Sequence, residues 1–229
     1  MTLPIRIGVP SISSDQMREV DRIMVEDLHI ELEQMMENAG STLALLADMR
    51  FSPSSATVLA GPGGNGGGGL AAARHLANRG VSVTVVLERD ELAPAPHHQA
   101  DILLRMGVAF SPSPVSADLV VDAVLGYGVH GDPRGRAAEL IAWANDERSP
   151  ILSLDAPSGL DLTTGAAGTP TVRAAATLTL ALPKRGLEVR PDLVGELYLA
   201  DISVPAEVYA AFGLEVADPF EAGPLVRLL

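Results

Sequence analysis

The N-terminal part of the chain has apolar residues at helical spacing. Between Met17 and Leu28 they recur every three or four positions, which predicts helix over residues 14–49 with Ser14 as its N-cap. We expect Asn38-Ala39-Gly40 to interrupt this helix. The Met35-Met36 pair within it is interpreted as core or dimer packing.

From residue 56 onward, short apolar runs alternate with segments of helical character. The predicted strands are residues 57–60, 81–87, 119–121, 151–154, 177–182 and 196–200, and the predicted helices are residues 69–78, 97–106 and 134–145. This alternation is typical of βαβ units, so we predict an α/β fold with a mainly parallel sheet and an N-terminal helical extension. In such folds, ligands bind beyond the carboxyl ends of the strands. Residues 90–98 and 111–116 are interpreted as surface loops.

The composition agrees with a folded domain. With 229 residues the chain is long enough for one domain with a sizeable core, and 47% of it is hydrophobic. We expect a single domain over residues 1–229, in which residues 1–50 are the helical extension and residues 51–229 are the core. Aromatic residues make up only 3%, so Leu, Val, Ile and Ala must fill that core.

Charge and cysteine content exclude several classes of function. The formal net charge of -13 argues against binding to nucleic acid, because little positive charge is available to neutralise a phosphate backbone. The absence of cysteine excludes disulfides, thiolate metal sites and a cysteine nucleophile. No apolar run reaches the roughly 18 residues that span a bilayer, and no signal-peptide pattern is present. We therefore expect a cytoplasmic protein that binds neither nucleic acid nor membranes.

A glycine-rich segment separates the first predicted strand from the helix that follows it. Seven of the nine residues from Gly61 to Gly69 are glycine, which predicts a turn with positive φ angles that approaches a ligand closely. The start of the following helix favours a phosphate group. The alternative is a tight turn without a ligand. The segment also matches G-x-G-x-x-G at Gly61, Gly63 and Gly66, with Glu88 beyond the next strand, although a run so rich in glycine fits many patterns.

Two further polar clusters follow later strands, beginning at Asp122 and at Asp155. The carboxyl ends of parallel strands meet at one edge of a sheet, so we expect both clusters to lie near the glycine-rich segment. A single acidic residue at a strand end is often only a cap or turn residue. Together with Asn65 and Ser158, however, these carboxylates offer hard oxygen ligands for an alkali or alkaline-earth cation. The five histidines form no metal-binding pattern, and His130 is a candidate ligand contact because of its turn.

Several motifs in order resemble the NAD(P)H-hydrate epimerase family, also called the YjeF N-terminal domain family. The resemblance runs from Met17 to about Tyr209 and includes Glu19-Val20-Asp21, Met36-Glu37-Asn38-Ala39-Gly40, Gly61-Pro62-Gly63-Gly64-Asn65-Gly66-Gly67, Asp122-Ala123-Val124-Leu125-Gly126-Tyr127-Gly128, Asp155-Ala156-Pro157-Ser158-Gly159-Leu160-Asp161 and Pro183-Lys184-Arg185-Gly186-Leu187. It implies a Rossmann-like three-layer sandwich, usually a homodimer. The implied activity interconverts the R and S epimers at C6 of hydrated NADH and NADPH, called NADHX and NADPHX. The dehydratase domain often fused to this one is expected to be a separate partner protein here.

The resemblance also implies roles for individual residues. The substrate would contact Gly64, Asn65, Gly66, Gly67, Gly68, Gly126, Tyr127, Gly128, Val129, His130, Gly131, Asp132 and Asp155. One potassium ion per subunit would be held by Asn65, Asp122 and Ser158. Asp155 is the candidate catalytic acid and base: protonation of the C6 hydroxyl lets the ring nitrogen expel it as water, and water then returns to the other face of the iminium.

The glycine-rich motif departs from the family's usual Asn-Asn-Gly-Gly-Asp-Gly, because Gly64 and Gly68 replace its first Asn and its Asp. Three interpretations therefore stay open. The first is an epimerase that works with Asp155. The second is a non-catalytic relative that binds a nucleotide or a protein partner. The third is another Rossmann enzyme, such as a nicotinamide dehydrogenase, although no region after residue 160 suggests a separate site for its substrate.

Overall fold

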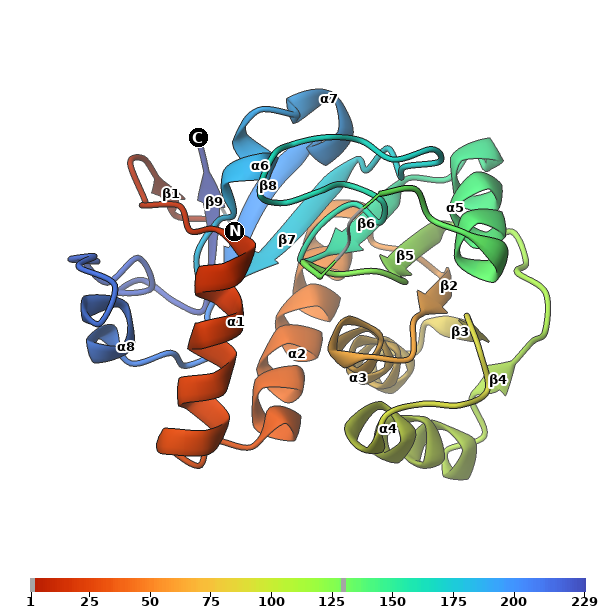
Figure 1. The fold of residues 1–229 in the computed structure, drawn as a ribbon. Coiled ribbons are helices and arrows are strands. Elements are labelled where there is room, and N and C mark those ends of the chain that lie inside the picture. Colours follow the sequence, from red (N-terminus) through yellow and green to blue (C-terminus); the bar gives the residue numbers. More distant parts are fainter. Residues whose placement is uncertain (1–2, 129–130) are drawn as a thin grey trace.

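A computed structural model describes residues 3–128 and 131–229 of the chain. Within these residues, nine strands form one sheet in the order β1-β9-β8-β7-β6-β5-β2-β3-β4 (Figure 1). Neighbouring strands are parallel, except that β8 and β9 are antiparallel. The chain winds outward from β2 in one direction and from β5 in the other. This reversal creates a crevice at the carboxyl ends of these two strands.

The elements follow the predicted alternation. The strands are β1 (Ile5–Arg6), β2 (Ser55–Ala60), β3 (Ser82–Leu87), β4 (Ala109–Phe110), β5 (Leu119–Ala123), β6 (Ile151–Leu154), β7 (Ala176–Leu180), β8 (Glu196–Ala200) and β9 (Leu225–Leu228). The helices are α1 (Ser14–Arg22), the π-helical segment η1 (Ile23–Asp27), α2 (Leu32–Phe51), α3 (Gly64–Asn78), α4 (Pro94–Arg105), α5 (Gly135–Asp146), α6 (Arg185–Glu188), α7 (Pro191–Val194) and α8 (Ala206–Ala210). The predicted α/β fold with a mainly parallel sheet is confirmed.

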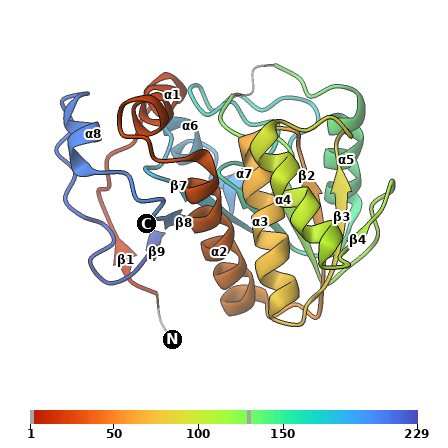
Figure 2. The ribbon, with the colours of Figure 1, turned by 90° about the horizontal axis from the view of Figure 1, so that it is seen from below.

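Helices cover both faces of the sheet and make three layers. α2, α3 and α4 lie side by side over one face, and α5 lies over the other (Figures 1 and 2). The residues of strand β2 show why helices cover both faces. Val58 and Ala60 pack in the core beneath α2 and α3, whereas Leu59 between them packs with Leu140 and Ile141 of α5. Both faces of this strand are buried, as expected for a parallel sheet that is covered on both sides.

The N-terminal helical region breaks at a different place from the one predicted. The break lies at residues 28–31, between η1 and α2, whereas α2 continues unbroken through Asn38-Ala39-Gly40. Gly40 allows α3 to approach, because a Cβ there would lie 2.5 Å from the Cβ of Ala71. Met35 and Met36 are buried, which agrees with core packing. Neither α2 nor any other helix in the described part of the chain is both long enough and apolar enough to span a membrane.

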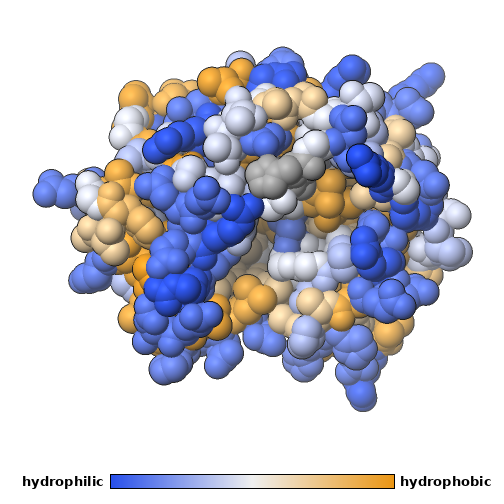
Figure 3. All heavy atoms as spheres, viewed as in Figure 1, coloured by the Kyte–Doolittle hydropathy of each residue, from blue (hydrophilic) through white to orange (hydrophobic). Residues whose placement is uncertain are grey.

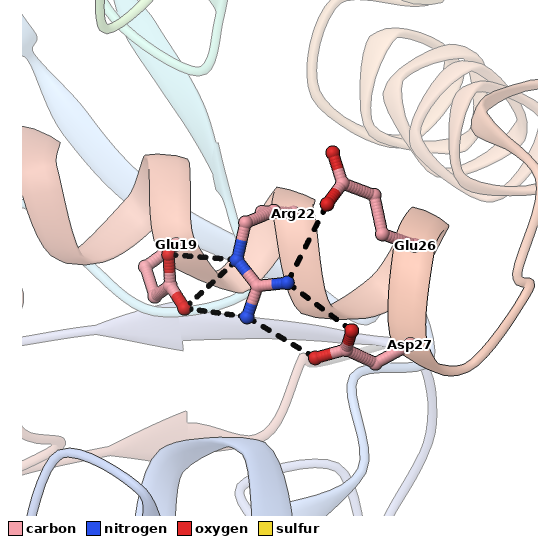
Figure 4. A network of polar contacts seen from close by, with 4 residues as sticks. All are labelled: Glu19, Arg22, Glu26 and Asp27. Atoms are coloured by element: carbon pink, nitrogen blue, oxygen red, sulfur yellow. Dashed lines mark hydrogen bonds and ion pairs between the residues drawn. The ribbon is translucent and has the colours of Figure 1, made fainter.

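Side chains hold both ends of α1. Its N-cap is Ser13 rather than the predicted Ser14, and Ser13 forms a capping box with Gln16. At the other end, the guanidinium of Arg22 binds a group of carboxylates from α1 and η1: Glu19, Glu26 and Asp27 (Figure 4). A cation at a helix C terminus is favourable, and here it also links the helix to the π-helical turn that follows.

Two boundaries differ from the prediction for local reasons. β7 ends at Leu180, earlier than expected, because Ala181 has a left-handed backbone with φ of 63°. α4 begins at Pro94, inside the segment expected to be a loop, since proline fits the first turn of a helix. His97 and His98 therefore lie on a helix; His97 is exposed, as expected for a surface residue.

Candidate active site

A cavity of about 910 Å³ opens at the carboxyl ends of the central strands. Its walls come from α1, the first half of α2, the N terminus of α3 and the segments that follow β3, β5 and β6. The space-filling view shows a hollow near the middle of this face, beside α1 (Figure 3). The three polar clusters of the sequence therefore meet at one edge of the sheet, in the crevice between β2 and β5.

The glycine-rich segment is mostly helical, so the expected turn is wrong. α3 begins at Gly64, and no glycine in this fully described segment has a positive φ angle. Close packing explains the glycines instead. A Cβ at Gly66 would lie 1.8 Å from the carbonyl oxygen of Gly61, and one at Gly69 would lie 2.4 Å from the Cβ of Ala123. The first turn of α3 lines the cavity, so its unpaired N–H groups are available to an anion there.

Positions 64 and 68, where this chain departs from the family motif, both lie on the cavity wall. A Cβ at Gly68 would lie 2.7 Å from Cδ2 of Leu154, so Leu154 takes the space in which a side chain at 68 would begin. Gly64 faces more open space, because a Cβ there would have Cε of Met36 as its nearest neighbour, at 4.0 Å. An anion at this wall would therefore meet backbone N–H groups and the side chain of Asn65.

Asp155 enters the cavity from the end of β6 with a left-handed backbone, at a φ of 63°. Such a backbone is uncommon outside glycine and is concentrated at functional sites. The side chain is 6% exposed and forms an ion pair with the fully buried ammonium of Lys184. This ammonium also donates to the carbonyl of Leu180 at 2.9 Å and to Oγ1 of Thr179 at 3.3 Å. The buried cation thus fixes the orientation of the Asp155 carboxylate at the cavity wall.

Asp122, Ser158 and Asn65 form a buried oxygen cluster next to the cavity. The carboxylate of Asp122 accepts hydrogen bonds from the backbone N–H of Ser158 at 2.9 Å, from Oγ of Ser158 at 2.5 Å and from Oγ of Ser153 at 2.8 Å. Burial raises the pKa of Asp122, and these hydrogen bonds act in the opposite direction. Nδ2 of Asn65 donates to the carbonyl of Leu125 at 3.0 Å, and the N–H of Leu125 donates to Oγ of Ser158 at 2.8 Å.

The chemistry of this cluster fits the predicted potassium ligands. Oδ1 of Asn65 is buried and has no hydrogen-bond partner among the described residues. A buried amide oxygen without a partner is costly, so this atom is suited to bind a cation or a water molecule. A cation would also offset the cost of burying the Asp122 carboxylate. The donor set of Asn65, Asp122 and Ser158 is therefore compatible with one monovalent cation.

Another carboxylate, that of Asp21 in α1, lines the same cavity. The hydroxyl of Tyr127 donates to its Oδ2 at 2.5 Å, and this bond joins α1 to the segment after β5. Burial raises the pKa of Asp21, while the hydrogen bond from Tyr127 and the charge of Lys184 lower it. Burial and the neighbouring carboxylate also raise the pKa of Tyr127, so its hydroxyl keeps its proton near neutral pH.

Most of the predicted substrate-binding residues line the cavity. They are Gly64, Asn65, Gly66, Gly68, Gly126, Tyr127, Gly128, Gly131, Asp132 and Asp155. Gly67 is turned toward α2 instead, because a Cβ there would lie 2.5 Å from Sδ of Met36. Val129 and His130 lie outside the described residues. Asp122 and Ser158 are fully buried beside the cavity, a position that suits ligands of a cation better than direct contacts to a substrate.

Lys184 and Asp21 had no predicted role, although both lie in motifs of the family resemblance. A lysine with no exposed surface needs a buried anion, but its burial becomes visible only when β7 and β6 are placed side by side. Asp21 has the spacing of a polar residue on an amphipathic helix, and the pattern does not show that this face of α1 closes a cavity. Only the motifs themselves pointed to these two residues.

Comparisons with known proteins match the chain over most of its length. Residues 32–186 match the family described as YjeF-related protein N-terminus. A protein of Dehalogenimonas lykanthroporepellens named NAD(P)H-hydrate epimerase is 47% identical, over 96% of this chain and 94% of its own. A protein of Hyperthermus butylicus named bifunctional NAD(P)H-hydrate repair enzyme Nnr is 42% identical over 79% of this chain, and the match spans 36% of that protein.

A solved structure shares the fold. The yeast protein ynu0 (YNL200c) matches with a TM-score of 0.83, over 96% of this chain and 100% of the yeast chain. Its sequence identity is 23%, so this likeness bears on the architecture alone. The arrangement of sheet and helices described above is thus one that an experimentally determined structure also adopts.

Proposed function

The chain belongs to the family of YjeF-related N-terminal domains, and on this premise we propose that it is an NAD(P)H-hydrate epimerase, an isomerase of NADHX and NADPHX. The observation that carries the proposal is the cavity in which the carboxylate of Asp155 lies near the N terminus of α3. Such a cavity offers an acid–base group beside a phosphate-binding helix end. The relatives that carry the epimerase name support this interpretation over a non-catalytic one.

The substrate is an anionic dinucleotide, and the cavity offers hydrogen-bond donors for it. The first-turn N–H groups of α3 would bind phosphate oxygens. Arg18, Arg89 and Arg134 line the cavity as well, although Arg89 is paired with Glu88 of the same lining. In a protein with a net charge of -13, such a local concentration of donors is needed to attract an anion. The hydrated nicotinamide ring would then reach the part of the cavity that Asp155 lines.

Asp155 would carry the proton that the reaction moves. Protonation of the C6 hydroxyl converts it to a leaving water, and the lone pair of the ring nitrogen forms a C=N bond as the C–O bond breaks. Water then adds to C6 of this iminium and returns one proton to a carboxylate. The sum of the two steps changes only the configuration at C6. Lys184 fixes Asp155 in place through these steps by its buried ion pair.

We further propose that Asn65, Asp122 and Ser158 hold one potassium ion per subunit. When bound, the ion would supply fixed positive charge beside the substrate-binding wall. Asn65 has a particular position, because it lines the cavity and also carries the buried Oδ1 atom without a partner among the described residues. It would therefore connect the cation site to the substrate site.

The relatives named bifunctional NAD(P)H-hydrate repair enzyme Nnr are longer than the part that this chain matches. We propose that this chain acts as an epimerase in the cytoplasm and as a homodimer, and that an NAD(P)HX dehydratase consumes the S epimer.

A coupled assay tests the proposed function. R-NADHX is mixed with the purified protein and an S-specific dehydratase in potassium buffer, and the return of NADH absorbance is followed. We expect a rate above the spontaneous epimerisation. Asp155→Asn should lower the enzymatic rate by about 100-fold or more, since general acid–base catalysis contributes about 10²–10⁴-fold.

The matched control is Asp146→Asn, because Asp146 is exposed at the end of α5 and does not line the cavity. This variant should keep the wild-type rate. If folded wild-type protein adds nothing to the spontaneous rate while an authentic epimerase does, the proposed function is wrong.

A further inference from the structure

Asp21 faces the same cavity as Asp155 from a different element. Asp155 lies at the end of β6, on the sheet side of the cavity, whereas Asp21 lies in α1, which passes in front of the sheet edge (Figure 1). The two carboxylates are close enough for their charges to influence each other, and the ammonium of Lys184 influences both. Two further carboxylates of the described residues line the cavity, but Glu88 is paired with Arg89 and Asp132 accepts a hydrogen bond from the backbone N–H of Thr169. Asp21 and Asp155 are thus two of the four carboxylates that the described part of the chain places there, and they approach from different walls.

The contacts of these two carboxylates differ. Asp155 is paired with the buried ammonium of Lys184. Asp21 instead accepts a hydrogen bond of 2.5 Å from the hydroxyl of Tyr127, a neutral donor. Arg18 lies over the ring of Tyr127, with its guanidinium carbon 6.0 Å from the ring centre, and so helps to hold that ring. Asp21 is therefore oriented by its neighbours without being neutralised by a direct ion pair in the described part of the chain.

Epimerisation through an iminium needs proton transfer on both faces of the ring. The water that leaves from one face needs an acid there, and the water that adds to the other face needs a base there. A single carboxylate serves both faces only if the ring turns over within the cavity. Two carboxylates on different walls remove that requirement.

We propose that Asp21 is a second proton-transfer residue of the epimerase. Asp21 serves the face of the nicotinamide ring turned toward α1, and Asp155 serves the face turned toward the sheet. Tyr127 is the positioning residue of Asp21. This inference rests on the proposed epimerase function. In one direction, Asp155 gives a proton to the leaving hydroxyl and Asp21 takes a proton from the adding water; in the other direction the roles are exchanged. One water leaves and one adds, so the oxygen at C6 comes from solvent after each turnover.

The environments of the two groups suit these roles. Burial raises the pKa of Asp21, and the charge of Asp155 does so too, whereas Tyr127 and Lys184 lower it. A carboxyl group with a raised pKa can hold a proton at a pH where an ordinary aspartate is ionised. The ion pair with Lys184 gives Asp155 a different environment. The two carboxylates thus differ in their direct partners, which are a buried ammonium for Asp155 and a neutral hydroxyl for Asp21.

Oxygen exchange provides the test. R-NADHX and S-NADHX, each labelled with ¹⁸O at the C6 hydroxyl, are incubated separately with wild-type protein, Asp21→Asn and Asp155→Asn in unlabelled potassium buffer. Mass spectrometry follows the label and chromatography follows the epimers. With wild-type protein we expect each turnover to replace the label. Asp21→Asn should lower epimerisation by about 100-fold or more, yet one of the two epimers should still lose its label with retention of configuration. Asp155→Asn should show the same behaviour with the other epimer.

If Asp21 had only a structural role, the two variants would not each lose label exchange with a different epimer. Asp27→Asn is the matched control, because Asp27 is exposed and binds Arg22 away from the cavity (Figure 4). It should behave as wild type. The inference is wrong if Asp21→Asn epimerises within threefold of the wild-type rate. It is also wrong if this variant loses label exchange with both epimers or keeps it with both. Either result would leave the proposed function intact. If wild-type protein does not epimerise NADHX, both the inference about Asp21 and the proposed function are wrong.

Tyr127→Phe gives a second readout that does not require loss of a charged group. The variant removes only the hydroxyl that lowers the pKa of Asp21. In the direction in which Asp21 acts as the base, we expect the acidic limb of the pH profile of kcat to move to higher pH, with Arg18, Lys184 and Asp155 unchanged around the site. A profile that keeps its position would contradict the positioning role, whatever the change in rate.

Discussion

Gly66 and Gly68 lie two positions apart in the first turns of α3, yet their surroundings differ in kind. A Cβ at position 66 would lie 1.8 Å from the carbonyl oxygen of Gly61, which is backbone. A Cβ at position 68 would lie 2.7 Å from Cδ2 of Leu154, the end of a side chain that has other rotamers. Backbone at the end of β2 has no comparable freedom, so the two positions differ in their tolerance of a side chain.

Alanine at these two positions should therefore have unequal effects on stability. Gly66→Ala is expected to lower the free energy of unfolding by about 3 kcal/mol or more, because overpacking against backbone cannot relax locally. Gly68→Ala is expected to stay within about 1 kcal/mol of wild type, since the gain of about 0.5–1 kcal/mol from replacing a helical glycine offsets the movement of Leu154. Urea unfolding followed by circular dichroism measures both. Equal losses would mean that Leu154 is as immobile as the backbone.

Single residues show where prediction from the sequence succeeds and where it stops. Asp122 and Asp155 were predictable because each lies at the carboxyl end of a strand, Asp122 within β5 and Asp155 directly after β6, and strand ends converge in a parallel sheet. The function of the glycines was predictable only in part: they lie at a helix start that suits phosphate, but they serve close packing and not positive φ. The role of Lys184 follows from its complete burial against Asp155, and no sequence pattern predicts that a lysine is buried.

At the scale of elements, the long periodic segments were predictable and the short edge elements were not. β6 and β8 have the predicted bounds, because each is a short apolar run between turn residues. β1 and β9 pair residues from opposite ends of the chain, such as Ile5 with Arg227. Two-residue and four-residue strands of this kind are fixed by tertiary contacts, and no local pattern records them.

One element contact has a defined pH dependence. Arg50 at the end of α2 donates to both carboxylate oxygens of Glu196 in β8, at 2.7 and 2.6 Å. This pairing, with the hydroxyl of Tyr198, lowers the pKa of Glu196 from 4.5 to about 2. A carboxyl group with a lowered pKa in the folded state stabilises the fold above its unfolded pKa, and this contribution is lost as the pH falls from about 4.5 toward 2.

Glu196→Gln should remove that contribution. At pH 7 we expect a loss of about 1 kcal/mol in the free energy of unfolding, a modest value because the side chain of Arg50 is 48% exposed and solvent screens the pair. The difference from wild type should shrink as the pH falls below 4.5, which chemical denaturation at several pH values measures. Glu139→Gln is the control, because its exposed pair with Arg136 lies within α5. A difference that stays constant down to pH 2.5 would argue that packing, and not charge, links α2 to β8.

At the scale of the whole molecule, the placement of the site follows from topology. The reversal of strand order between β2 and β5 puts a crevice at their carboxyl ends, and the alternation of strands and helices along the sequence already predicts a crevice of this kind. The sequence does not show that α1 closes the crevice, because this depends on how an amphipathic helix packs on a distant edge. The hydrogen bond between Asp21 and Tyr127 is therefore a property of the assembled molecule.

The net charge is also a property of the whole molecule, and it determines which salts must be compared to test the proposed potassium site. A protein with a charge of -13 gains stability from any added salt through screening, so salt alone is not diagnostic. KCl and NaCl at equal ionic strength screen equally, and the difference between them isolates specific binding. Potassium at about five times its dissociation constant would add about 1 kcal/mol of stability. For a domain of this size, that raises Tm by about 2–4 °C.

We therefore expect a higher Tm in KCl than in NaCl for wild-type protein, and no such difference for Asn65→Ala. Asn65 is the informative position because its buried Oδ1 has no partner in the described part of the chain, so its removal takes away a ligand at little cost in internal hydrogen bonding. The variant does lose the 3.0 Å hydrogen bond to Leu125, but this lowers Tm equally in both salts and cancels in the comparison. Equal Tm values in the two salts for wild type, or a difference that survives in Asn65→Ala, would place the cation effect elsewhere on this acidic surface.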